Sequence, residues 1–313
     1  MDGTLSGSIK KALGPKAEAL MVAIDATESI DELVQNLAIY PPSAYHLGQA
    51  VLGSMLIQAM SDTDDHERYD LQWKIEGPFG NLVAEALDTG KYRASIAKTQ
   101  TAEDTFGKPL GDGILQVRRS NKDGKQVASG LIETLGTVAE DLTDYLERSE
   151  QKKCALALYV NIDWDESRGK EFPFKVKKAI GYLVHILPAD SEAKQDVTVA
   201  MWDKHLKDLG PMSNWELPED PDKATSAIFS FLTGLPENPI TYSSQIQQNC
   251  PCSESRIFRA VELLTNSEKK WILNGPEEQQ KKESLEVECE FCGQVYEISK
   301  DDFIKAKSKK MKI

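Results

Sequence analysis

Four of the five cysteines in this 313-residue chain lie in two close pairs near its C-terminus. The first pair is Cys250 and Cys252, separated by a proline, and the second pair is Cys289 and Cys292. A tetrahedral zinc ion takes four soft ligands, and two short turns that each carry two thiols can supply them. Two thiols this close can also oxidise to each other once no metal holds them. The four cysteines therefore predict a metal site that oxidants can attack.

The ligand types favour a structural zinc ion. None of the four histidines is close to either cysteine pair in the sequence. A catalytic zinc keeps an open position, whereas four thiolates fill its coordination sphere. We therefore predict one zinc ion per chain in the reduced state, bound by Cys250, Cys252, Cys289 and Cys292.

The Cys289–Cys292 spacing is also found in disulfide oxidoreductases. In thioredoxin-type enzymes this motif opens a helix after a strand, and the helix N-terminus lowers the pKa of the thiol. Here Val295, Tyr296 and Ile298 alternate as a strand after the motif. A Cys-x-x-Cys-Gly turn between two strands indicates a zinc knuckle, which weakens the oxidoreductase alternative without removing it.

The first part of the chain, residues 1–189, is predicted to be an α+β domain with an antiparallel sheet and helices. A helix is expected from Pro42 to about Ser61, with strands after it that short turns join into a meander. Thr137 and Glu140 have the spacing of a capping box, which begins another helix. This domain supplies the rigid body on which the remaining segments can pack.

Residues 1–189 show no catalytic constellation. The glycine clusters lack the lysine and the helix start of a phosphate-binding loop, and neither His-Glu-x-x-His nor Gly-x-Ser-x-Gly occurs. Cys154 begins an apolar strand and is expected in the core without a chemical role. Residues 163–178 are charged and rich in turn formers, as in a surface insertion. We therefore expect a protein that is not an enzyme.

Residues 190–240 are predicted to be a metastable helical linker. Two short amphipathic helices are expected, and such helices are marginal in water unless they pack on a surface. They are either simple linker helices docked on the main domain or a segment that docks and detaches on cue. Their apolar faces hold Val199, Trp202, Leu206 and Leu209 in the first helix, and Ile228, Phe231, Leu232 and Leu235 in the second.

Residues 241–313 are predicted to be a small zinc-binding domain. A helix capped by Ser253, a shorter helix over 268–273 and a hairpin around the second cysteine pair make only a thin core. In so small a domain a metal supplies stability that burial cannot.

The net charge of −13 argues against a general nucleic-acid-binding protein. A cluster of lysines in the C-terminal tail keeps open the alternative of a zinc-ribbon nucleic-acid-binding or translation factor; these are Lys305, Lys307, Lys309, Lys310 and Lys312. No apolar stretch is long enough to span a membrane, and no secretory signal is visible. We expect a cytoplasmic protein in a reducing compartment, where paired cysteines are more often metal ligands or redox centres than structural disulfides.

Several segments match a known pattern. Residues 250–256, Cys-Pro-Cys-Ser-Glu-Ser-Arg, and residues 286–296, which contain Cys-Glu-Phe-Cys-Gly, closely resemble the redox-regulated heat-shock holdase chaperones of about thirty-three kilodaltons (Hsl-O family). His-Leu-Gly-Gln-Ala at 46–50, Glu-Gly-Pro-Phe-Gly at 76–80 and the stretch 139–151 are also similar to that family.

The resemblance implies a specific mechanism. The reduced protein would hold zinc and be inactive, and oxidation would form Cys250–Cys252 and Cys289–Cys292 disulfides and release the metal. The linker would then lose its fold, and the protein would bind unfolding clients without ATP and form a homodimer. Together with the marginal linker helices, this makes four apolar residues the candidates for client binding: Trp202, Leu206, Phe231 and Leu232.

Overall fold

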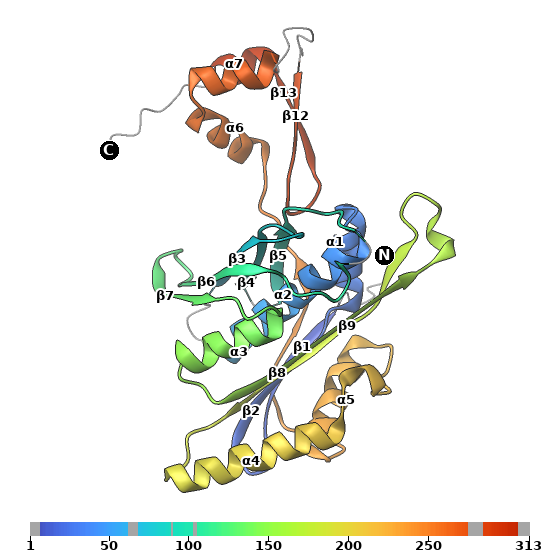
Figure 1. Cartoon of the computed structure of the whole chain (residues 1–313), viewed down its shortest axis with the longest axis vertical. Coiled ribbons are helices and arrows are strands. Elements are labelled where there is room, and N and C mark those ends of the chain that lie inside the picture. Colours follow the sequence, from blue (N-terminus) through green and yellow to red (C-terminus); the bar gives the residue numbers. More distant parts are fainter. Residues whose placement is uncertain (1–6, 62–67, 89, 103–104, 275–283, 306–313) are drawn as a thin grey trace. The chain divides into compact units, whose positions relative to one another are not determined.

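The computed structural model contains two compact units, residues 1–249 and 250–313 (Figure 1). The predicted α+β class is confirmed, because antiparallel sheets and separate helices build the first unit. Within the described part of the chain, no helix is both long and apolar enough to cross a membrane. The structure describes residues 7–61, 68–88, 90–102, 105–274 and 284–305.

A five-stranded antiparallel sheet joins the two ends of the first unit. Strand β10 pairs with β1, with Ser8 opposite Gln245, so the chain after the linker returns to its own beginning. Residues 241–249 consequently belong to the first unit, and the units divide later than the boundary expected at 241. The strands in spatial order are β10 (Ile240–Gln245), β1 (Ser8–Leu13), β2 (Ala19–Asp25), β9 (Phe174–Ile186) and β8 (Cys154–Trp164).

A six-stranded sheet contains the expected meander. The five strands β3 to β7 pair antiparallel with their neighbours in the sheet. The two-residue strand β11 pairs in parallel with β5 at one edge. The spatial order is β11 (Gln247–Gln248), β5 (Lys91–Ile96), β4 (Leu82–Asp88), β3 (Arg68–Glu76), β6 (Asp112–Ser120) and β7 (Gln126–Glu133).

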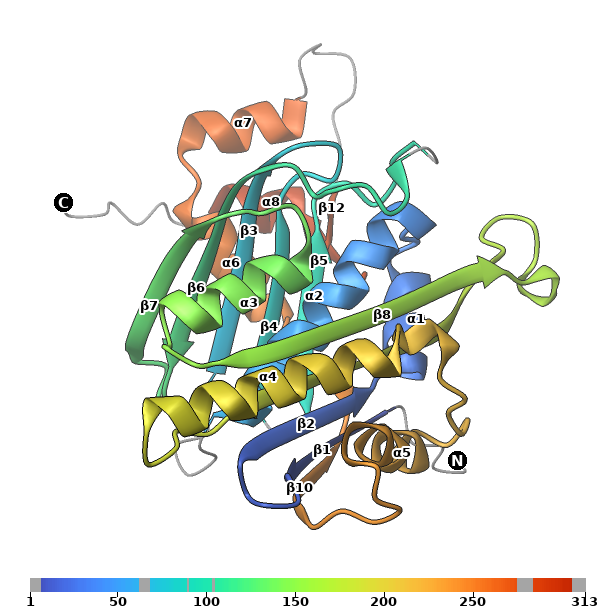
Figure 2. The same cartoon turned by 60° about the horizontal axis from the view of Figure 1, so that its bottom comes forward.

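Helix α2 (Pro41–Met60) forms the centre of the first unit (Figure 2). It contacts strands of both sheets, and eighteen of its twenty residues are buried. A helix enclosed by two sheets is largely apolar on all sides, and the polar side chains of α2, such as His46 and Gln49, are buried as well. Helix α1 (Thr27–Asn36) packs beside it, and α3 (Val138–Arg148) begins at the predicted capping box, where the Glu140 N–H donates to Thr137 Oγ1 at 3.2 Å.

Helices α4 (Glu192–Leu209) and α5 (Pro221–Thr233) cover the other face of the five-stranded sheet. Figure 2 shows α4 lying along this sheet. A short 3-10 turn, Met212–Asn214, lies between the two helices. The apolar cluster beneath them joins Trp202, Met212, Ile228, Phe229 and Leu232 to sheet residues that include Ala12, Met21, Ala23, Tyr182 and Val184.

The predicted apolar face of α4 is confirmed, whereas that of α5 is only partly right. Phe229 is fully buried, and Phe231 instead stacks on Trp215 with ring centroids 4.8 Å apart. Leu235 is 41% exposed, because α5 ends at Thr233 and the left-handed Gly234 turns the chain away. The apolar face predicted from the sequence thus extends past Thr233, where the helix ends.

Charged and polar contacts also hold α5 on the sheet. The buried Lys10 of β1 pairs with Asp222 at 2.9 Å between Nζ and Oδ2. The same ammonium donates to the Asp222 carbonyl oxygen at 2.8 Å and to Ser226 Oγ at 2.9 Å. Burial removes water from the Lys10 ammonium, and these three contacts replace the hydration that it has lost. The start of α5 is therefore fixed to β1.

Residues 163–178 form the largely exposed end of the β8–β9 hairpin, in keeping with a surface insertion. Strands β8 and β9 continue into this stretch and enclose only the 3-10 turn Glu166–Arg168 and its flanking residues. The buried Asp31 of α1 pairs with Arg168 and accepts the Val176 N–H at 2.9 Å. At the start of β8, Cys154 packs partly buried against the main core, where burial raises the pKa of its thiol to about 12.

The second unit has the thin core expected from its size. Among its described residues only Val261, Ile298 and Phe303 are buried apolar side chains. Ser253 precedes α6 as predicted, but its hydroxyl contacts Ser255 Oγ instead of capping the helix. Of the lysine tail, only Lys305 lies in the described chain. The elements are α6 (Glu254–Leu263), α7 (Asn266–Asn274), β12 (Ser284–Glu288), β13 (Val295–Ser299) and α8 (Lys300–Lys305).

Burial of His46 in α2 predicts that the first unit is less stable in acid. This side chain lies against the Phe79 ring, and burial lowers the pKa of its imidazole to about 4. The unfolded chain binds a proton at the ordinary pKa near 6.5, so stability is lost as pH falls from about 6.5 towards 4. We expect a loss of about 2 kcal/mol between pH 7 and pH 5 from this residue.

Urea denaturation followed by tryptophan fluorescence at the two pH values measures this loss. His46→Gln should remove most of the pH dependence, and His205→Gln, on the linker helix α4, should retain it. An unchanged dependence in His46→Gln would contradict this assignment.

Candidate metal centre

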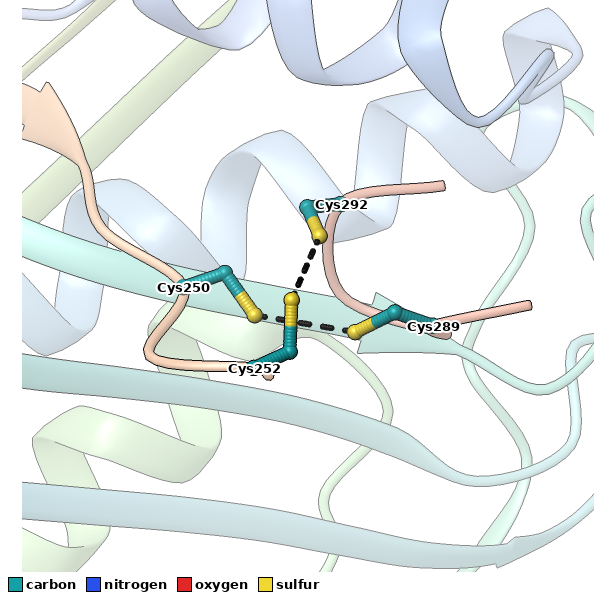
Figure 3. A group of neighbouring side chains, drawn as sticks. All are labelled: Cys250, Cys252, Cys289 and Cys292. Carbon is teal, nitrogen blue, oxygen red and sulfur yellow. Dashed lines mark hydrogen bonds between the residues drawn. The ribbon is translucent and has the colours of Figure 1, made fainter. Parts of the chain in front are cut away.

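Two loops bring the four paired cysteines of the second unit together. Cys250 and Cys252 precede α6, and Cys289 and Cys292 lie in the turn between β12 and β13. Figure 3 shows the four side chains pointing towards one another. All four Sγ atoms lie within 4.8 Å of one another, and all four residues are free thiols.

The sulfur spacing fits a tetrahedral metal ion. The Sγ atoms of Cys250 and Cys289 are 3.6 Å apart, and those of Cys252 and Cys292 are 3.4 Å apart. Four sulfurs around a tetrahedral zinc, each about 2.3 Å from it, lie about 3.8 Å from one another. Each short contact joins one cysteine pair to the other. An ion held here would therefore clamp two segments that are distant in the sequence.

The second pair forms the knuckle that the sequence predicted. The Cys289 carbonyl oxygen accepts the Gly293 N–H at 2.8 Å, and the Cys289 N–H donates to the Gln294 carbonyl oxygen at 3.0 Å. Gly293 has a φ of 71°, a conformation that glycine adopts without steric cost. Strand β13 follows directly, so the helix that a thioredoxin-type motif requires is not formed at this turn.

Hydrogen-bond donors surround the sulfur atoms. The Cys252 N–H donates to the Cys250 sulfur, and the Gln294 N–H donates to the Cys292 sulfur. In addition, the Tyr296 hydroxyl donates to Cys252 Sγ at 3.1 Å. The sequence pattern indicated only that Tyr296 is part of a strand. Its place on the return strand, four residues after Cys292, was the available signal.

Three of the thiols, Cys250, Cys252 and Cys292, have shifted pKa values. Burial raises the pKa of Cys250 to about 11 and also raises that of Cys292. Burial opposes ionisation of Cys252 too, but hydrogen bonds from Tyr296 and the neighbouring thiols lower its pKa below the usual value. A metal ion binds the deprotonated forms, so protons compete with it for this cluster.

The ligand set suits zinc. The group consists of four sulfur atoms, with no carboxylate or imidazole among the described residues that form it. Thiolates are soft donors, and four of them in a tetrahedron are typical of structural zinc sites. The chain's own residues can thus hold a metal ion without further ligands.

The other predicted site residues lie in the first unit. Trp202 and Leu232 are buried beneath α4 and α5, and Leu206 and Phe231 are partly buried. All four lie on the helices that cover the five-stranded sheet. Full exposure of all four side chains would require these helices to leave the sheet.

The comparisons with known proteins cover both units. A family model described as Hsp33 protein matches residues 8–299, from β1 to the end of β13. The chain belongs to the Hsp33 protein family. The match includes all four paired cysteines and both linker helices, and it favours a chaperone over a zinc-ribbon factor or an oxidoreductase.

Individual relatives agree with this family. The chain is similar to proteins named 33 kDa chaperonin from Aquifex aeolicus, 25% identical over 91% of this chain and 85% of the relative, and from Thermodesulfovibrio yellowstonii, 26% identical over 96% and 97%. It also resembles the crystal structure of the 33 kDa chaperonin (heat shock protein 33 homolog) of Thermotoga maritima. That likeness has a TM-score of 0.77 at 20% identity and covers 96% of this chain and 97% of the other, which shows a common fold.

Removal of one cluster cysteine should remove the metal. We expect one zinc ion per wild-type chain, because four thiolates complete its coordination. Cys289→Ser should lose stoichiometric metal after gel filtration, as measured by elemental mass spectrometry. Cys154→Ser is the matched control and should keep the metal, since Cys154 lies in the first unit. Equal metal content in the two variants would contradict the assignment.

Proposed function

We propose that this protein is a redox-regulated, ATP-independent holdase chaperone that is inactive while its four thiolates hold zinc. The proposal rests on one observation: four free thiols lie together in a unit whose described residues bury few apolar side chains. The chain also belongs to the Hsp33 family. A change at the sulfur atoms would therefore decide whether that unit stays folded.

In the reduced state Cys250, Cys252, Cys289 and Cys292 would bind the ion and tie the loop before α6 to the β12–β13 turn. When bound, zinc would supply a cross-link whose apparent free energy is ~10 to 16 kcal/mol in zinc-finger peptides. The core around Val261, Ile298 and Phe303 is small, so this cross-link is needed for stability.

Oxidation by a peroxide would convert the ligands into disulfides. A thiolate sulfur attacks one peroxide oxygen, the O–O bond breaks, and a sulfenic acid forms as the other oxygen leaves as hydroxide, which takes a proton from solvent to become water. A second thiol attacks that sulfur, the S–S bond forms, and a second water leaves. Formation of each disulfide thus transfers two electrons from two sulfurs to one peroxide molecule. The oxidised sulfurs no longer carry the charge that holds the ion.

We propose the pairs Cys250–Cys252 and Cys289–Cys292. In the folded unit the shortest contacts join sulfurs of different pairs, at 3.4 and 3.6 Å. Those partners are about forty residues apart in the chain, so they separate when the unit unfolds, whereas neighbours within a pair remain close. Unfolding therefore favours bonds within each pair.

Release of the linker helices would then create the client surface. In this proposal residues 1–189 are the client-binding domain, 190–240 the metastable linker and 241–313 the redox switch, in which residues 241–249 pair with the first unit and residues 250–313 carry the cysteines. The chain runs from α5 through β10 directly to Cys250, so unfolding of the second unit can loosen β10 and α5. Detachment would expose the apolar sheet face around Met21, Tyr182 and Val184 and the helix faces that cover it. Surfaces of this kind bind the apolar segments of unfolding proteins.

The surface exposed by detachment would also allow two oxidised chains to associate into a homodimer.

The switch requires thiols that start reduced, as in the cytosol. The net charge of −13 offers no general attraction to nucleic acids. Unfolding proteins are therefore the proposed partners.

The main test compares zinc-bound and peroxide-treated protein in suppression of citrate synthase aggregation without ATP. We expect protection only after treatment, together with zinc release and new proteolytic cleavage within residues 190–240. Equal protection by both forms would exclude a metal-gated switch. Unchanged cleavage after zinc loss would exclude release of the linker.

The client-binding candidates can be tested in the oxidised protein. Leu206→Ser and Phe231→Ser should each weaken client binding by about tenfold or more, since an apolar side chain contributes about 1.5–3 kcal/mol. The matched controls are Val197→Ser and Met201→Ser, whose side chains are already 66% and 54% exposed on α4. Binding to an unfolded fluorescent client measures the effect, and equal losses in candidates and controls would argue against a specific face.

A further inference from the structure

The Tyr296 hydroxyl reaches one sulfur of the metal centre. Its O–H donates to Cys252 Sγ at 3.1 Å. Apart from contacts among the four thiols themselves, the other hydrogen bonds to sulfur described above come from backbone N–H groups within the two cysteine loops. Tyr296 differs from them because it lies on β13 and reaches across to the sulfur of the first loop. This bond therefore links the hairpin to the loop before α6 by a side chain.

The hairpin holds this side chain in place. Tyr296 lies opposite Val287, and Ile298 lies opposite Leu285, so these four residues share one face of the β12–β13 pair. Ile298 is buried in the core of the second unit, and Leu285 and Val287 pack against it. The face that carries Tyr296 is thus the inner face. A change of the tyrosine hydroxyl alone leaves these packing contacts intact.

A hydrogen bond to a thiolate changes what the sulfur can do. The donor withdraws negative charge from the sulfur, which becomes a poorer nucleophile. Outer hydrogen-bond partners of metal ligands also orient them, and their loss typically costs 10–100-fold in metal affinity. An O–H donor at Cys252 would have both effects at this sulfur and little effect on the three others.

We propose that Tyr296 is a positioning residue of the metal centre, which orients the Cys252 thiolate as a ligand and shields it from electrophiles. This inference rests on the four-thiolate zinc site proposed above. It assigns to Tyr296 a part in setting how readily the centre loses its metal.

The test uses full-length, zinc-loaded protein and the variant Tyr296→Phe, which removes only the hydroxyl. A substoichiometric amount of iodoacetamide is added, and the initial alkylation rate of each cysteine is measured by mass spectrometry. We expect Cys252 to react about tenfold faster in the variant, with small changes at the three other ligands. Transfer of zinc to a chelating dye should be faster by a similar factor.

Ser299→Ala is the matched control for stability. Ser299 Oγ accepts the Asp302 N–H at 3.2 Å at the start of α8, so its loss weakens the unit without a change near the sulfurs. Such a variant should raise the reactivity of all four cysteines together. Tyr296→Phe would overturn the inference if it gave that uniform pattern, or if it kept its zinc and left Cys252 unchanged. A wild-type protein without zinc would instead contradict the proposed function itself.

Discussion

The meeting of four thiols from two distant turns is the contact on which the second unit depends. The described residues of this unit form three short helices and one hairpin, and their core has only three buried apolar side chains. A core of that size contributes little stability, because small units bury too small a fraction of their surface. The closest sulfur contacts cross from one cysteine pair to the other, so the cluster closes the unit. In the proposed function, folding of this unit would depend on the state of these four sulfurs.

The first unit is stabilised in a different way. Helix α2 is enclosed by two sheets, and burial of apolar residues on all of its sides supplies the stability that the second unit lacks. Helices α4 and α5 lie outside that core, on the opposite face of one sheet, and each buries a single face. They are long enough to cover the sheet but depend on it for stability. The proposed switch needs a stable first unit, two helices that can detach from it and a second unit whose folding depends on the metal.

The sequence predicted structural features that depend on neighbouring residues, and it missed most features that depend on contacts with distant segments. The face of Trp202, Leu206 and Leu209 follows from helical period alone and is confirmed. The face on α5 was extended to Leu235 for a local reason, because the helical period was followed past the stop signal at Gly234. The helix at Pro41–Met60 was predicted at nearly these bounds, but its burial on all sides follows only from the two sheets that enclose it. The pairing of β10 with β1, between opposite ends of the unit, has no local signal at all.

By itself the sequence determined the candidate ligands, their soft character and the knuckle between β12 and β13, because residue type and spacing within a few residues set the shape of a turn. Only the tertiary structure decided that sulfurs of different pairs are nearest neighbours, and that Tyr296 reaches Cys252 across the unit. Those contacts join residues about forty positions apart. Their geometry depends on how the hairpin packs against α6 and α8, which no short stretch of sequence records.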